Sequence, residues 1–128
     1  MYLERRYMLQ YSDILRGLTD SLILAQLEYG DSYGYEISKT ILKESDGSIE
    51  LKEASLYTSF RRLEEAGYIT SYWGDENSGA RRRYYTLNDE GKVFITENKE
   101  DWKKISKQIS DLLSGKKKKE KNKDEYKS

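Results

Sequence analysis

The sequence predicts a mainly α-helical chain with a small β-hairpin. The 128 residues include no proline, which suits helices, and apolar residues recur at helical spacing in several segments. Two runs rich in strand-forming residues, YITSYW and RRYYTL, flank the polar loop GDENSGA, as expected of a hairpin. The order helix, helix, helix, hairpin, helix is that of a winged helix-turn-helix followed by one further helix.

Composition excludes several kinds of chemistry. Cysteine and histidine are absent, so we expect no disulfide, no metal site and no cofactor. No apolar run approaches the length of a membrane span and no signal peptide opens the chain, which predicts a soluble, cytoplasmic protein without a membrane partner. Because the formal net charge is zero, any binding to nucleic acid has to come from local positive patches.

Apolar residues at helical spacing predict the first three helices. The first is expected from Asp13 to Glu28 and the second over about residues 33–43, with the glycines of YGDSYGYE between them. The third is the clearest, because KEASLYTSFRRLEEAGYI carries one buried apolar stripe and a terminal glycine. The stripe residues are Leu56, Phe60 and Leu63, and the terminal glycine is Gly67.

Two further features complete the predicted fold. The turn ESDGSIEL is long for a helix-turn-helix, and we expect Ile49 and Leu51 within it to form a short strand or an extended segment pinned to the hairpin. The last helix is expected to begin near Asn88 or Asp89, either of which is a suitable N-cap, and to run to about Leu113.

Three consecutive arginines, Arg81, Arg82 and Arg83, concentrate positive charge in the returning half of the hairpin, close to Gly79. Arginine binds phosphate oxygens through two parallel hydrogen bonds and also enters narrow minor grooves. Since side chains alternate along a strand, Arg81 and Arg83 share one face and Arg82 takes the other. We expect two of the three to contact DNA, the alternative being a solvated loop without function.

The face of the third helix opposite its apolar stripe supplies the other candidate contacts. Arginine, serine and threonine there can reach base edges or phosphates. For Tyr57, packing at the border of the two faces is an equally good interpretation. A solvated face, with an i,i+4 pair between Arg61 and Glu65, is the alternative for the whole helix. The candidates on and around this helix are Ser38, Lys39, Lys52, Ser55, Tyr57, Thr58, Arg61 and Arg62.

The last helix carries an apolar seam with heptad spacing. A lone helix cannot bury such a seam, so we expect a homodimer, with packing against the first helix of the same chain as the alternative. A two-fold dimer presents two recognition helices to successive major grooves. Trp102 is either part of this seam or, facing its copy, one wall of a slot for a planar hydrophobic or cationic small molecule. The seam residues are Ile95, Asn98, Trp102, Ile105, Ile109 and Leu112.

Several strings of the sequence are more specific than these patterns. They are YGYEI, ASLYTSFRRLEEAGYI, SYWGDENSGARRRYYTLNDEG and the tryptophan early in the last helix. On these strings, residues 13–113 resemble the PadR family of transcriptional regulators, in particular its small subfamily. The resemblance implies a dimeric repressor acting on its own gene and on a nearby efflux-type gene. It also implies DNA contacts at Tyr57, Thr58 and the segment from Gly79 to Arg83.

The resemblance further implies a central drug-binding pore with Trp102 as its aromatic wall. Asp20 and Lys99 depart from the family pattern, because they are charged where a neutral or aromatic lining is expected. The candidate ligand-binding residues are Trp102, Ile14, Leu18, Asp20 and Lys99.

The sequence therefore predicts a sequence-specific DNA-binding transcriptional regulator, and specifically a ligand-responsive repressor with an operator in double-stranded DNA. The alternative is a winged-helix protein-interaction module without operator binding. We predict no enzymatic activity, because no catalytic motif is present. The predicted segments are an N-terminal arm (1–12), the winged helix-turn-helix DNA-binding domain (13–88), a C-terminal dimerisation helix (89–113) and a lysine-rich disordered tail (114–128).

Overall fold

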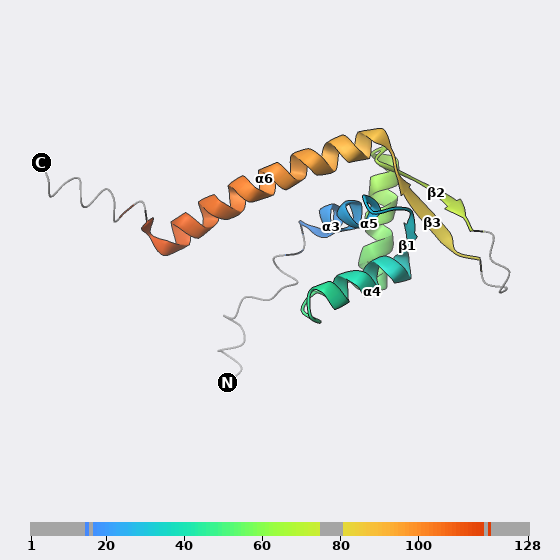
Figure 1. The fold of residues 1–128 in the computed structure, drawn as a ribbon, viewed down its shortest axis with the longest axis horizontal. Coiled ribbons are helices and arrows are strands. Elements are labelled where there is room, and N and C mark those ends of the chain that lie inside the picture. The colour runs from blue at the N-terminus through green and yellow to red at the C-terminus, as the bar shows by residue number, and fades with distance from the viewer. Residues whose placement is uncertain (1–14, 16, 75–80, 117, 119–128) are drawn as a thin grey trace, which may run out of the picture. The chain divides into compact units, whose positions relative to one another are not determined.

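The computed structural model describes residue 15, residues 17–74, residues 81–116 and residue 118. The chain forms two compact units, residues 1–95 and residues 96–128, which are called the winged-helix unit and the C-terminal unit below. Figure 1 shows the elements of both, and each unit is described by itself. The prediction of a mainly helical chain with a small β-sheet is confirmed.

The helices of the winged-helix unit follow the apolar spacing of the sequence. They are α3 (Thr19–Leu27), α4 (Gly34–Glu44) and α5 (Glu53–Glu65), and α6 (Asp89–Ser114) begins in this unit. The expectation of one unbroken first helix is wrong, because Gly17 and Leu18 form a turn before α3. Glycine is a poor residue for a helix interior, which accounts for a break at this place.

The hairpin forms as predicted, and a third strand joins it. Strands β2 (Ile69–Trp73) and β3 (Arg83–Leu87) pair antiparallel, with Ile69 opposite Leu87. Strand β1 (Ser32–Tyr33) pairs with the other edge of β3, which gives the order β1-β3-β2. Of the two forms expected for Ile49 and Leu51, the short strand does not occur, and neither residue pairs with the hairpin. Leu51 instead points its side chain into the core, where it is 9% exposed.

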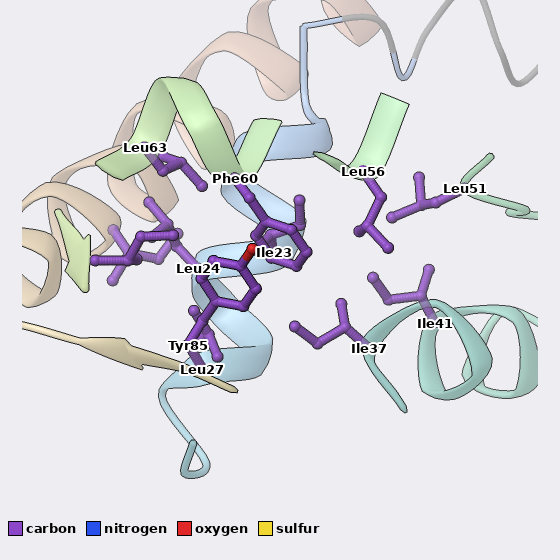
Figure 2. Close-up of a cluster of buried hydrophobic side chains, with 12 residues drawn as sticks. Ile23, Leu24, Leu27, Ile37, Ile41, Leu51, Leu56, Phe60, Leu63 and Tyr85 are labelled. Carbon is purple, nitrogen blue, oxygen red and sulfur yellow. The ribbon is translucent and has the colours of Figure 1, made fainter. Parts of the chain in front are cut away.

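The core joins the helices to the sheet (Figure 2). Leu56, Phe60 and Leu63 of α5 are all buried, which confirms the predicted stripe. The ring of Phe60 stacks on Tyr85 of β3, with 3.8 Å between ring centroids and 12° between planes. Helix α5 and the hairpin are therefore positioned by one shared core. The other members of the core are Ile23, Leu24, Leu27, Ile37, Ile41, Leu51, Ile69 and Ile95.

The junction between α5, the sheet and α6 is built from predicted cap residues. Gly67 has a φ of 82°, the left-handed conformation that ends many helices. The side-chain amide nitrogen of Asn88 donates to the carbonyl of Gly67 at 2.6 Å. The side-chain oxygen of Asn88 accepts from the Gly91 N–H at 2.9 Å. The second bond is that of an N-cap, so the prediction of Asn88 as a cap is confirmed.

Gly91 allows the first turn of α6 to approach the sheet. A Cβ at this position would overlap the backbone carbonyl of Tyr68 and the side chain of Leu87. Only glycine fits at this position, and it lets the first turn of α6 pack against the sheet. One turn further on, Ile95 reaches the core of the winged-helix unit, where it is 1% exposed. Among the described residues, no helix is long and apolar enough to cross a membrane.

Candidate nucleic-acid interface

The outer face of α5 carries the predicted contact residues in exposed positions. Ser55, Thr58 and Arg61 are exposed, and Lys52 directly precedes the helix. The Thr58 hydroxyl donates to the carbonyl of Ala54 at 2.8 Å. The expected ion pair between Arg61 and Glu65 is not formed in the part of the chain that the structure describes. No acidic partner there holds the Arg61 guanidinium, which is consistent with a contact to an external anion.

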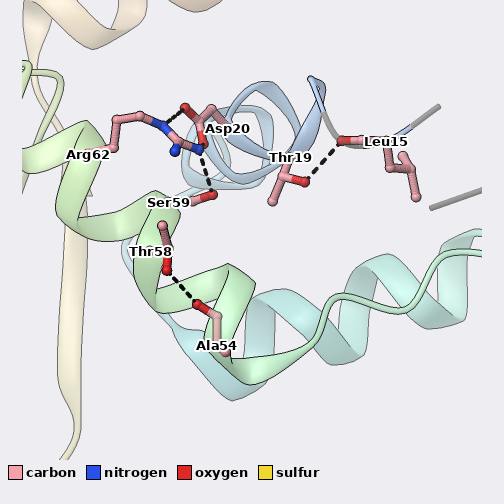
Figure 3. A network of polar contacts seen from close by, with 7 residues as sticks. All are labelled: Leu15, Thr19, Asp20, Ala54, Thr58, Ser59 and Arg62. Carbon is pink, nitrogen blue, oxygen red and sulfur yellow. Dashed lines mark hydrogen bonds and ion pairs between the residues drawn. The ribbon is translucent and has the colours of Figure 1, made fainter. Parts of the chain in front are cut away.

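Arg62 differs from Arg61, because a carboxylate of another helix holds it (Figure 3). Its Nε donates to Asp20 Oδ2 at 2.7 Å and its Nη2 donates to Asp20 Oδ1 at 2.6 Å. The same Nη2 lies 3.3 Å from the hydroxyl oxygen of Ser59, a residue that is 2% exposed. The hydrogen bonds to Asp20, followed by its negative charge, raise the pKa of Arg62 above its ordinary value. Arg62 thus links α5 to α3.

Arg83 is held in a similar way in the hairpin of β2 and β3, which with Arg81 and Arg82 is called the wing below. Its Nη2 lies 3.3 Å from Glu64 Oε1, and its Nε and Nη2 both donate to the Ser71 hydroxyl, at 3.0 and 2.8 Å. Glu64 is in α5, Ser71 in β2 and Arg83 in β3, so this cluster ties α5 to both strands of the hairpin. Sequence reasoning missed Glu64 and Ser71, because nothing local marks a contact between positions far apart in the chain.

Arg81 and Arg82 lie against aromatic rings. The Arg81 guanidinium is 5.7 Å from the ring centroid of Trp73, and that of Arg82 is 4.6 Å from the ring centroid of Tyr33. Both distances fit cation–π contacts, which orient the guanidinium without neutralising its charge. Gly79 lies outside the described residues.

A hollow of about 450 Å³ separates the wing arginines from α5 and the start of α4. Tyr57 reaches it from α5, is 46% exposed and meets Phe60 edge to face at 5.9 Å between centroids. Tyr57 therefore packs on the core and still presents surface to the hollow. The hollow is lined by Tyr33, Gly34, Tyr35, Tyr57, Trp73, Arg81, Arg82, Arg83 and Tyr85.

Helix α4 offers two of the predicted phosphate contacts. Lys39 is exposed, and its Nζ lies 5.7 Å from the ring centroid of Tyr35. Ser38 is half-buried, and its hydroxyl donates to the carbonyl of Tyr35 at 3.1 Å. Lys39 is therefore available to an external anion, whereas the Ser38 hydroxyl is already engaged.

The C-terminal unit leaves an apolar stripe exposed along α6. Trp102, Ile105 and Ile109 are each nearly half exposed, and Leu112 is 77% exposed. The seam prediction needs correction at Ile95, which is buried in the core of its own chain and offers no surface to a partner. Asn98 is half-buried. The exposed stripe therefore starts after Ile95 and follows the expected heptad spacing.

The predicted ligand-binding residues fall in different places. Trp102 and Lys99 are exposed in the C-terminal unit. Leu18 is half-buried in the winged-helix unit, and Ile14 lies outside the described residues. Asp20 forms an ion pair with Arg62, and its side chain is 25% exposed. No cluster of acidic side chains in the described segments is suited to a metal ion.

Comparison with known proteins gives the family. The model of the transcriptional regulator PadR-like family matches residues 23–97, from α3 into α6. A transcriptional regulator from Clostridium thermocellum is 44% identical with a TM-score of 0.73, over 80% of this chain and 96% of that chain. A PadR family regulator from Clostridium difficile is 42% identical with a TM-score of 0.66, over 76% of this chain and 99% of that chain.

A further structure holds DNA. Bacillus subtilis PadR, in complex with operator DNA, is 26% identical with a TM-score of 0.56, over 65% of this chain and 46% of that chain. The family model covers more than half of the chain, and the two Clostridium chains align with it over nearly their own whole length. The chain belongs to the PadR-like family of transcriptional regulators, which are DNA-binding proteins and not enzymes.

Proposed function

We propose that this chain regulates transcription by binding a specific operator with α5 in the major groove and the wing on the DNA backbone. The observation that carries the proposal is the hollow between Tyr57 of α5 and Arg81 and Arg82 of the wing. The aromatic ring of Tyr57 from α5 and the guanidinium groups of the wing line this hollow together. The Phe60–Tyr85 stack fixes this surface from beneath.

The exposed side chains of α5, α4 and the wing each have a role set by their chemistry. Thr58 and Arg61, on the centre of the α5 face, read base edges, since arginine binds guanine and threonine contacts bases or the thymine methyl. Arg81 and Arg82 bind phosphates of the backbone. The supporting phosphate contacts are Lys39, Lys52, Ser55 and Tyr57. Ser38 adds a contact when its hydroxyl rotates away from the carbonyl of Tyr35.

The test is fluorescence anisotropy with a duplex that the wild-type protein selects from a randomised pool. Arg81→Ala/Arg82→Ala is expected to lower the affinity and to reduce the slope of log affinity against log salt by about 2, roughly one unit per phosphate contact. Lys103→Ala/Lys107→Ala is the control, because it removes the same charge from the face of α6 opposite the apolar stripe. No enrichment of any sequence, or equal losses in both variants, would refute the proposal.

We also propose that the chain is a homodimer held by the exposed stripe of α6. A buried two-fold seam explains apolar side chains at heptad spacing that the chain itself leaves exposed. Ile105→Asp is expected to yield monomers in light scattering and to weaken operator binding strongly, whereas Lys103→Asp, on the opposite face, leaves both unchanged. If Ile105→Asp abolished cellular function while Arg81→Ala/Arg82→Ala did not, the protein-interaction alternative would be favoured.

The last part of the proposal is that the regulator is a ligand-responsive repressor of its own gene and a nearby efflux-type gene. It rests on the family resemblance and on Trp102, whose ring is 46% exposed within the stripe. Planar hydrophobic and cationic dyes are expected to quench the tryptophan fluorescence of the wild-type protein. They are also expected to release the protein from its duplex. Trp102→Ala should abolish the release while keeping DNA affinity. An unchanged response in this variant would exclude Trp102 as the ligand wall.

A further inference from the structure

The strongest unassigned feature of the described residues is the contact between α3 and the outer edge of α5. Asp20 and Arg62 are 42 positions apart in sequence, and two parallel hydrogen bonds join them in the fork geometry that arginine and carboxylate prefer. Figure 3 shows the Arg62 side chain turned toward α3, with Ser59 beneath it. The guanidinium is therefore oriented by three acceptor atoms within the chain.

The surroundings make this pair more constrained than an ordinary surface ion pair. The Asp20 side chain is 25% exposed, whereas that of Arg62 is 57% exposed. The carboxylate thus gives up part of its hydration, and the guanidinium replaces it with directed hydrogen bonds. Exposed pairs contribute little unless the geometry is bidentate or part of a network. Both conditions hold here, because Ser59 of the core accepts from the same Nη2 atom.

The pair also lies beside the DNA-facing surface. A hollow of about 450 Å³ runs along this edge of α5 and is lined by Thr19, Lys52, Ser55, Thr58 and Arg62, among others. Arg61 and Arg62 are consecutive, so their side chains leave the helix about 100° apart. Arg61 faces outward, and Arg62 leans back to α3. Two residues that look equivalent in the sequence therefore meet different surroundings.

We propose that Arg62 is a positioning residue: the Asp20–Arg62 ion pair clamps the recognition helix to α3 and sets its rotation, and Arg62 does not bind DNA. The part that concerns DNA rests on the proposed function. The clamp itself is a property of the free protein. Asp20 is a part of this clamp and not a lining residue of a ligand pore.

The DNA test measures affinity for the duplex selected by the wild type at several salt concentrations. Asp20→Asn and Arg62→Gln are each expected to lower affinity several-fold, and the double variant no more than either single one. Their salt slopes should equal that of the wild type. Arg81→Gln is the control, since it removes the same charge from a proposed phosphate contact and should lower the slope by about 0.9.

A swapped pair gives the sharpest outcome. Asp20→Arg/Arg62→Asp restores the ion pair but puts a negative charge at position 62. A clamp predicts that affinity recovers above that of the single variants, whereas a phosphate contact at position 62 predicts a further loss. A slope reduced by about 0.9 in Arg62→Gln, or unchanged affinity in Asp20→Asn, would also overturn the proposal.

A second measurement needs no DNA and separates failure of the clamp from failure of the proposed function. Thermal unfolding of the four chains in the Asp20/Arg62 cycle is expected to show lower midpoints in both single variants, by about 2–5 °C, and no further fall in the double variant. Additive shifts would show that the two residues are not coupled. Coupling without any DNA binding would retain the clamp and reject the operator-binding proposal.

Discussion

Helix α5 carries two adjacent arginines and the wing three, and in both places neighbouring arginines meet different surroundings. In α5, Arg62 is bound by Asp20 and Arg61 faces outward. In the wing, Arg83 is bound by Glu64 and Ser71, whereas Arg82 lies over the Tyr33 ring. Neighbouring side chains point about 100° apart on a helix and to opposite faces on a strand. A run of arginines is therefore not one patch, because each residue meets a different environment.

The largest expected effect comes from breaking the core that joins the two regions. Phe60→Ala removes a ring that is 1% exposed and stacked on Tyr85 of the wing. We expect a loss of about 3–5 kcal/mol of unfolding free energy, from lost burial and the cavity left behind. Chemical denaturation measures it. Tyr29→Ala, at a ring that is 90% exposed, is the control, and a similar loss there would contradict the argument.

The next largest effect compares the loss of Arg82 with the loss of Arg83 in DNA binding and stability. Arg82→Ala is expected to weaken binding to the selected duplex about tenfold and to lower the salt slope by about 0.9. Arg83→Ala should instead lower the unfolding midpoint and leave the salt slope unchanged, because Glu64 already neutralises its charge. Anisotropy titrations at several salt concentrations, with melting curves, distinguish the two. Identical salt slopes in both variants would contradict different roles for Arg82 and Arg83.

A smaller change in DNA affinity, a gain instead of a loss, is expected when Glu64, the partner of Arg83, is neutralised. Glu64→Gln loses an exposed ion pair worth about 0.2–1 kcal/mol of stability. It also leaves Arg83 with an uncompensated charge next to the DNA surface. We therefore expect slightly lower stability together with higher DNA affinity and a steeper salt slope. Glu65→Gln, the adjacent exposed carboxylate, controls for charge alone, and a larger gain of affinity in it would contradict this account.

The smallest expected effect is on the pH dependence of stability, and it arises from Asp31 next to β1. The pKa of Asp31 is held below its ordinary value of 3.8, first by a hydrogen bond with Thr86 and then by one with Tyr72, whose hydroxyl donates to Asp31 at 2.6 Å. A lowered folded-state pKa gives stability that is present above the unfolded value and lost as pH falls through the folded value. The stability difference between wild type and Asp31→Asn should therefore shrink between about pH 5 and pH 2. A constant difference in unfolding free energy would rule out this linkage.

Local signals in the sequence were enough to predict most of the fold. The stripe of Leu56, Phe60 and Leu63 has helical spacing, Gly67 ends that helix, and Asn88 caps the next one. Each of these depends on residues within a turn or two of one another, so the chain reveals them directly. The hairpin is equally local, because its two strands flank one polar loop.

The remaining features depend on which segments meet in space. Strand β1 has two residues, too short for any alternation to be visible, and it exists because β3 offers it an edge. The partner of Arg62 is a carboxylate on another helix, whereas the sequence suggested only the adjacent pair of Arg61 and Glu65. Ile95 fits the heptad seam by spacing, yet the close approach at Gly91 turns it into the core. Spacing does not distinguish these outcomes.

The hydrogen bond from Thr58 to the Ala54 carbonyl limits what this residue can recognise. A hydroxyl has one hydrogen to donate and two lone pairs to accept with, and here the hydrogen is already used. What remains toward the groove is an acceptor beside a methyl group. Such a pair favours the exocyclic amino groups of adenine or cytosine and the thymine methyl, and disfavours the acceptor edge of guanine. If α5 lies in the major groove as proposed, Thr58 therefore contacts a base as an acceptor and not as a donor.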